Sequence, residues 1–180
     1  MFNGIIKNTG KVKKISINKK NCDLEIFSHI KMSKREIGSS ISCSGVCLTL
    51  EKISGKTSKY YLSKETLKKT NFKYLKKGNI INLEKSIKFG EKVSGHFVQG
   101  HVDATCQVSK ISLIGKSWYI NFKLSKKYMI NLIQKGSISL NGVSLTISKI
   151  LKNGFQIVVV PQTLKLKKLF FLKKNEFVNV

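Results

Sequence analysis

Two short stretches of this chain repeat one pattern around a residue that can do chemistry. Residues 44–49 read Ser-Gly-Val-Cys-Leu-Thr, and residues 141–146 read Asn-Gly-Val-Ser-Leu-Thr. The apolar frame is the same in both, but the central polar residue changes from the thiol of Cys47 to the hydroxyl of Ser144. A duplicated site with one altered polar group raises the question of whether the two copies do different jobs.

The threonine two positions after each polar residue adds a second polar group. Residues two apart in a strand share a face, so Cys47 pairs with Thr49 and Ser144 pairs with Thr146. Taken alone, Cys47 is more simply interpreted as a small structural residue. The pairs, however, suit hydrogen bonding to a heterocycle that carries carbonyl and ring-nitrogen groups.

A second candidate opens the latter half of the chain, where residues 95–103 read Gly-His-Phe-Val-Gln-Gly-His-Val-Asp. Glycine lets a backbone approach a ligand closely. His101 takes the position of Ile5 in the repeat described below, so the core of a barrel does not require it. A lone histidine is commonly an ordinary surface or core residue, and we find no third ligand at metal-binding spacing. We therefore expect no metal site here.

The motifs of several other enzyme classes are missing from this sequence. The chain has no Gly-x-Ser-x-Gly elbow, no Walker motif and no dinucleotide-binding fingerprint. Its four cysteines include no Cys-x-x-Cys pair, so we expect Cys22, Cys43, Cys47 and Cys106 to be free thiols.

An internal repeat must position the candidates. Gly4 falls on Gly100 at an offset of 96, and residues 45–53 fall on residues 142–150 at an offset of 97. Blocks in the same order at an almost constant offset indicate two homologous halves.

We expect these halves to span residues 1–88 and 89–180 and to fold alike. Short alternating stretches with turn signals about every 8–12 residues predict small antiparallel barrels rather than a parallel α/β sheet. Helices are expected over residues 64–69 and 125–133, and a short joint over residues 86–91 should hold the barrels close together. The expected strands include residues 12–17, 24–27, 41–43, 46–50, 60–62, 80–83, 118–122, 138–140, 143–147 and 155–160, the last ended by Pro161.

The net charge of +25 admits two explanations, a polyanion partner such as RNA or coding bias. Arg35 is the only arginine, and the lysines are spread along the chain rather than clustered between aromatic residues, so we favour coding bias. No apolar run approaches the roughly 18 residues of a membrane helix. The N-terminus lacks the basic and apolar regions of a signal peptide, so we expect a cytoplasmic protein.

Together these motifs resemble one family, riboflavin synthase of the alpha-chain type. The resemblance runs from Met1 to Val180, and the central motif occurs once in each half of the chain. It implies an all-β chain of two homologous six-stranded antiparallel Greek-key barrels in tandem, with short helices between strands. The matching stretches are residues 1–6, 44–49, 64–67, 95–103, 135–138, 141–146 and 161–164.

The resemblance also implies an activity. Two molecules of 6,7-dimethyl-8-ribityllumazine undergo dismutation, in which one donates a four-carbon unit to the other. The products are riboflavin and 5-amino-6-(D-ribitylamino)uracil, in the last step of riboflavin biosynthesis. The family uses no metal or redox cofactor. Its homotrimer forms the active site between the N-terminal barrel of one chain and the C-terminal barrel of a neighbour, and association with lumazine synthase is a further implied partnership.

The resemblance assigns roles to the polar pairs. Cys47, a hydroxyl or water adds to the acceptor while His101 assists proton transfer, and Ser144 and Thr146 stabilise the exomethylene anion of the donor. Thr49 completes the catalytic candidates, and which barrel holds the donor is left open. The residues implied to line the two lumazine sites are Gly4, Ile5, Ile6, Cys47, Leu48, Thr49, Tyr61, Leu62, Ser63, Lys64, Glu65, Thr66, Gly100, His101, Val102, Lys135, Ser144, Leu145, Thr146, Val158, Val159, Val160, Pro161, Gln162 and Thr163.

Two departures from the family pattern stand out. Asn141 occupies a position where relatives often carry aspartate, so we expect that a carboxylate there is not essential. The sequence stops at Val180, where relatives continue into a C-terminal trimerisation helix; we expect that helix to be absent and the trimer to be weak or formed differently. The alternatives are a lumazine- or flavin-binding relative without catalysis and a basic barrel that binds nucleic acid, which lacks the interleaved aromatic residues.

Overall fold

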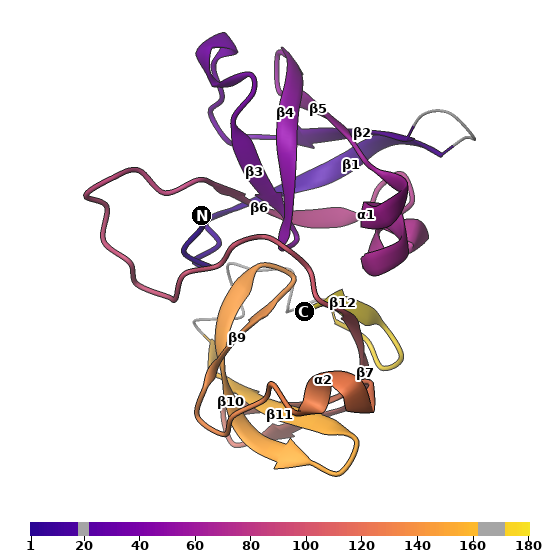
Figure 1. Ribbon diagram of the computed structural model, residues 1–180, viewed down its shortest axis with the longest axis vertical. Helices are drawn as coiled ribbons and strands as arrows, with labels where there is room; N and C mark the ends of the chain where they lie inside the picture. The colour runs from indigo at the N-terminus through magenta and orange to yellow at the C-terminus, as the bar shows by residue number, and fades with distance from the viewer. Residues whose placement is uncertain (18–21, 162–171) are drawn as a thin grey trace.

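The computed structural model describes residues 1–17, 22–161 and 172–180 and shows two β-barrels stacked along the long axis of the molecule (Figure 1). The first barrel is closed, with its strands in the order β1-β2-β5-β4-β3-β6. Neighbouring strands are antiparallel throughout. Its strands are β1 (Asn8–Ile17), β2 (Cys22–Ser28), β3 (Ser40–Cys43), β4 (Val46–Ser54), β5 (Thr57–Tyr61) and β6 (Ile80–Lys85).

The second half forms a six-stranded sheet with the same circular order, β12-β7-β8-β11-β10-β9. Where β3 pairs with β6 in the first barrel, β9 and β12 are joined by a hydrogen bond from Asn141 N to Asn179 O at 2.9 Å. Ser44 N and Asn82 O make the equivalent bond at 2.8 Å. The two antiparallel barrels and the repeat predicted from the sequence are therefore confirmed. The strands are β7 (Thr105–Ile114), β8 (Ser117–Lys123), β9 (Ser137–Leu140), β10 (Val143–Leu151), β11 (Gly154–Val159) and β12 (Phe177–Asn179).

Short helices connect some of the strands. The helix α1 (Lys64–Lys69) is as predicted, whereas α2 (Lys126–Met129) is shorter than the expected 125–133. Of the expected apolar face, Met129 and Leu132 pack against the core of the second barrel, but Ile133 is 72% exposed, so burial does not favour a helix as far as residue 133. Two 3-10 helices, η1 (Lys34–Glu36) and η2 (Asn71–Tyr74), complete the elements. No helix in the described part of the chain is long and apolar enough to span a membrane.

The tight turns β3–β4 and β9–β10 lie against each other at the centre of the molecule. Ser44 and Gly45 have φ values of 46° and 82°, and Asn141 and Gly142 have 48° and 79°. Positive φ at both central residues is the type I′ geometry that suits two-residue hairpins. A Cβ added to Gly45 would lie 2.7 Å from the backbone N of Gly142, so the two turns meet closely.

The segments that precede β1 and β7 are exchanged between the barrels. We call residues 2–6 the N-terminal strap and residues 98–102 the central strap. They pair with each other through Phe2 N to Val98 O at 2.8 Å and Val98 N to Phe2 O at 3.0 Å. Ile6 is buried in the core of the second barrel, and Val102 packs against the core of the first. Each barrel core thus includes or contacts a residue from the strap of the other half.

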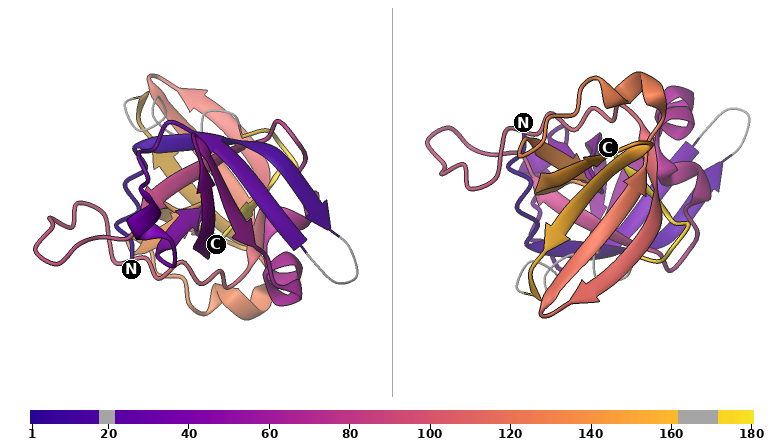
Figure 2. Two further views of the ribbon diagram at one scale, coloured as in Figure 1. Left: turned by 90° about the horizontal axis from the view of Figure 1, so that it is seen from above. Right: turned by 90° about the horizontal axis from the view of Figure 1, so that it is seen from below.

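This exchange changes the expected joint between the halves. The connection from β6 to β7 runs over residues 86–104, not over a short stretch at 86–91. Its first part loops away from both barrels, and its last part forms the central strap (Figures 1 and 2). The barrels are close, but through exchanged straps rather than through a short linker.

Candidate functional site

The two polar pairs lie on the outer faces of β4 and β10. Along β4, Val46, Leu48 and Leu50 are buried, whereas Cys47 is half-buried and Thr49 is exposed. The first five residues of β10 repeat this pattern of burial. The thiol and hydroxyls therefore point away from the barrel cores, and each pair shares one face as the sequence predicted.

The ends of β5 and β11 lie beside these pairs. Leu50 pairs with Tyr60, and Ile147 pairs with Ile157. Because the strands are antiparallel, the residues after Tyr60 run back alongside Cys47 and Thr49. The residues after Ile157 run alongside Ser144 and Thr146 in the same way.

The exchanged straps complete both sites. Cys47 N donates to Gly100 O at 2.8 Å, and Ser144 N donates to Gly4 O at 2.9 Å. Both glycines are in the left-handed region, and a Cβ on Gly4 would lie 2.7 Å from the Cβ of Ser144, while one on Gly100 would lie 2.6 Å from the Cβ of Cys47. Only glycine allows such an approach at both positions.

The implied lining residues thus gather into two sites. The Cys47 site contains residues 47–49, 61–66 and 100–102. The Ser144 site contains residues 4–6, 144–146 and 158–161. Lys135 lies at the edge of the Ser144 site, because its backbone N donates to Ile147 O at 2.9 Å. Gln162 and Thr163 lie outside the described residues.

Within these sites, some side chains face the protein and others face solvent. Ser63 caps α1, since its Oγ accepts from Thr66 N at 3.0 Å. Glu65 pairs with Lys69 at 3.0 Å on the exposed side of α1. Five lining residues have buried side chains and can meet a ligand only through the backbone: Ile6, Leu48, Leu62, Leu145 and Val159.

A histidine that the sequence analysis did not assign lies at the Ser144 site. The Nδ1 atom of His96 is 2.7 Å from Ser144 Oγ. Burial lowers the pKa of the His96 imidazole, which favours the neutral ring near pH 7. The repeat could not point to His96, because at the offset of 96 its equivalent position falls before Met1. The signal in the sequence was its place in the glycine-flanked stretch of residues 95–103.

His101 is exposed and lines a cavity of about 290 Å³ between the central strap and the second barrel. The same cavity is lined by His96, Tyr128 and Ser139. The role of His101 beside Cys47 stays a prediction from the sequence.

Cys47 differs from the other cysteines in its accessibility. Cys47 is half-buried, whereas the other three are buried free thiols. Burial raises the pKa of Cys43 and of Cys106, and burial followed by the nearby charge of Asp23 raises that of Cys22. Within the described ranges, no three His, Cys, Asp or Glu side chains gather where they could hold a metal ion.

A buried asparagine network joins the two barrels next to the sites. Asn179 Nδ2 donates to Ser44 O at 2.9 Å, and its Oδ1 accepts from Asn71 N at 2.7 Å. Asn82 Nδ2 donates to Asn141 O at 2.9 Å, and Asn141 Oδ1 accepts from Asn179 N at 2.9 Å. Asn141 is therefore part of the interface between the barrels.

The sequence of this chain is similar to those of known proteins along its whole length. A family model described as the lumazine binding domain matches residues 3–86 and again residues 99–180. The chain is 34% identical over 184 residues to the riboflavin synthase of Buchnera aphidicola subsp. Schizaphis graminum, covering 100% of this chain and 88% of that one. It is 32% identical over 185 residues to the riboflavin synthase of Escherichia coli (strain K12), covering 100% and 85%.

Solved structures show the same fold. LumP complexed with riboflavin superposes with a TM-score of 0.87 at 26% identity, over 99% of this chain and 97% of that chain. LumP complexed with 6,7-dimethyl-8-(1'-D-ribityl) lumazine superposes with a TM-score of 0.85 at 25% identity, with the same coverage. The doubled family match and the full-length similarity show that this chain belongs to the riboflavin synthase family and is built from two lumazine-binding domains.

Proposed function

We propose that this chain is a riboflavin synthase, a transferase that moves a four-carbon unit between two molecules of 6,7-dimethyl-8-ribityllumazine. The products are riboflavin and 5-amino-6-(D-ribitylamino)uracil. The observation that carries the proposal is the presence of two equivalent sites that differ in one polar group, Cys47 in one and Ser144 in the other. A reaction in which identical molecules play different parts needs two such related but unequal sites.

The Ser144 site has the groups that a donor requires. The donor must lose a proton from its C7 methyl group, and the neutral imidazole of His96 is a base held at hydrogen-bond distance from Ser144. Ser144 and Thr146 can then hydrogen-bond the ring as it takes up the negative charge. We therefore assign the donor to the Ser144 site.

We assign the acceptor lumazine to the Cys47 site. There, Cys47, a hydroxyl or water adds to the ring, with Thr49 on the same face and His101 assisting proton transfer. Much of the rate comes from holding two flat rings face to face, because proximity replaces a bimolecular encounter.

The two rings are supplied by neighbouring chains in this proposal. Within one chain, Cys47 and Ser144 each follow a buried turn, at Ser44-Gly45 and at Asn141-Gly142, and these two turns meet at the centre of the molecule. We infer that the turns separate the two rings that one chain binds. This separation supports a homotrimer whose active sites form between the N-terminal barrel of one chain and the C-terminal barrel of the next. A cytoplasmic location and association with lumazine synthase stay predictions from the sequence.

The test is to incubate the chain with 6,7-dimethyl-8-ribityllumazine, without added metal, and to follow riboflavin by absorbance and chromatography. We expect riboflavin and the pyrimidine product in equal amounts. Cys47→Ser should lower the rate more than it weakens binding. Tight binding of the lumazine without turnover would refute the proposal and favour a binding protein, as the structural similarity to ligand-bound LumP allows.

Sedimentation of the same samples tests the assembly. We expect activity to rise with the fraction of trimer as the protein concentration increases. Full activity in a strictly monomeric sample would show that the site between chains is wrong.

A further inference from the structure

A carboxylate of the first barrel holds the strap that completes the Ser144 site. Glu84, near the end of β6, accepts from Asn3 N through Oε1 at 2.8 Å and from Gly4 N through Oε2 at 3.0 Å. Hydrogen bonds to a charged acceptor are stronger than neutral ones, and two of them on adjacent amides fix an orientation as well as a position.

Asn3 links the N-terminal strap to the segment that carries His96. Its Oδ1 accepts from Gly95 N at 2.7 Å, and its backbone O accepts from His96 N at 3.3 Å. Its Nδ2 donates to Lys92 O at 3.0 Å, which fixes the preceding loop.

Both polar contacts of Ser144 therefore depend on the strap that Glu84 holds. Gly4 O accepts from Ser144 N at 2.9 Å, and His96 Nδ1 lies 2.7 Å from Ser144 Oγ. If the strap shifted, both contacts would change together, although Glu84 itself touches neither Ser144 nor His96 in these interactions.

The contacts of Glu84 are made to the N-terminal strap. At the repeat offset of 96, the residues of the central strap that correspond to Asn3 and Gly4 are Gln99 and Gly100, and Gly100 O accepts from Cys47 N at 2.8 Å. Because Glu84 bonds the strap of the Ser144 site, we expect a change at Glu84 to act on that site.

We propose that Glu84 is a positioning residue for the Ser144 site, acting through Asn3 and Gly4 to orient His96 and Ser144 toward one of the two lumazine molecules. This inference rests on the proposed function for the ligand that the site takes. It predicts that loss of the carboxylate impairs the Ser144 site alone and leaves the Cys47 site intact.

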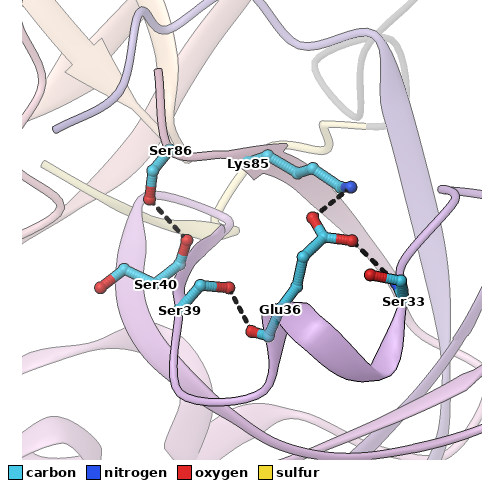
Figure 3. Close-up of polar contacts among 6 residues, drawn as sticks. All are labelled: Ser33, Glu36, Ser39, Ser40, Lys85 and Ser86. Carbon is cyan, nitrogen blue, oxygen red and sulfur yellow. Dashed lines mark hydrogen bonds and ion pairs between the residues drawn. The ribbon is translucent and has the colours of Figure 1, made fainter. Parts of the chain in front are cut away.

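Glu84→Gln is the sharpest variant. It keeps the size of the side chain but replaces one acceptor oxygen by an NH₂ donor, which then faces a backbone N–H. The matched control is Glu36→Gln. Glu84 and Glu36 both line one cavity of about 1020 Å³. The carboxylate of Glu36, however, bonds Lys85 and Ser33 instead of the strap (Figure 3).

Turnover and site-resolved binding are measured on the full-length chain. We expect Glu84→Gln to lower kcat about 10- to 100-fold, the range expected for losing one hydrogen bond to a charged group, while Glu36→Gln keeps kcat. Titration with the ribityllumazine should show that the Ser144 site is weakened. Ligand protection of Cys47 against alkylation should be unchanged, because that protection reports the Cys47 site.

A double-mutant cycle separates positioning from a general structural role. If Glu84 acts through Ser144, Glu84→Gln should cost much less in a Ser144→Ala background than in the wild type. Independent multiplication of the two effects, wild-type kcat in Glu84→Gln, or equal weakening of both sites would overturn the inference.

The inference and the proposed function fail separately. If the wild type binds lumazine but makes no riboflavin, the proposed function is wrong, while selective weakening of the Ser144 site by Glu84→Gln still supports the positioning role. If Glu84→Gln does not fold, Asn3→Ala gives a second test, because it removes the side-chain bonds to Gly95 N and Lys92 O while the backbone bonds to Glu84 and His96 stay; we expect a smaller loss at the Ser144 site than that predicted for Glu84→Gln. Unimpaired binding and kcat in Asn3→Ala would then overturn the inference.

Discussion

Replacing Gly4 by alanine tests whether the exchanged strap builds the Ser144 site. Gly4 has a φ of +73°, and an added Cβ would lie 2.7 Å from Ser144 Cβ and 2.8 Å from Ser144 N. The matched control is Gly115→Ala, since Gly115 has a φ of +59° but no atom within 4 Å of an added Cβ. The two variants share backbone strain and differ in the collision with Ser144.

The contrast between the variants can be worked out from these contacts. An alanine at positive φ costs about 1–2 kcal/mol of folding free energy at either position. At Gly4 the Cβ must also retreat to the usual carbon–carbon separation of about 3.5–4.0 Å. This shift of about 1 Å breaks the bond from Ser144 N to Gly4 O, which is worth about 1 kcal/mol net and about 1–3 kcal/mol if the amide stays buried. We therefore expect Gly4→Ala to be about 1–3 kcal/mol less stable than Gly115→Ala.

Thermal unfolding and lumazine titration measure the outcome. A difference of 1 kcal/mol corresponds to about 2–4 °C in Tm for a chain of this size. We also expect Gly4→Ala to weaken the Ser144 site while Gly115→Ala leaves binding unchanged. Equal Tm values for the two variants, together with unchanged binding in Gly4→Ala, would refute the structural role of the strap.

Three further predictions follow from burial and hydrogen bonding. Asn179→Ala leaves two buried backbone groups without their partner and should lower the free energy of unfolding by about 2–4 kcal/mol in denaturant titrations, whereas the exposed Asn131→Ala should change it by less than about 0.5 kcal/mol. Alkylation of the native chain near neutral pH should label Cys47, and mass spectrometry should find the other three cysteines modified only after unfolding, because they are buried. Burial lowers the pKa of His96, so the unfolded chain binds more protons as the pH falls below about 6.5; the free energy of unfolding should decrease there, and less steeply in His96→Gln.

Local sequence patterns were sufficient for the fold and for the polar pairs. Strand alternation places Cys47 and Thr49 on one face, because successive side chains in a strand point to opposite sides. The Asn141-Gly142 turn follows from residues that tolerate positive φ. The repeat then assigns the same elements to both halves. Strand alternation and turn residues are local signals that act within a few residues. The repeat applies the same local signals to the second half of the chain.

The composition of each site was decided by tertiary structure. The contacts of Glu84 with Asn3, of Asn3 with Gly95 and of His96 with Ser144 span 81, 92 and 48 residues of sequence. No periodicity or turn chemistry encodes such contacts. They arise because the straps pack across the two barrels, with Ile6 in the core of the second. The sequence alone thus determined two barrels and their outward-facing polar groups, whereas the exchange of straps decided which residues surround each group, since that choice depends on packing between distant segments.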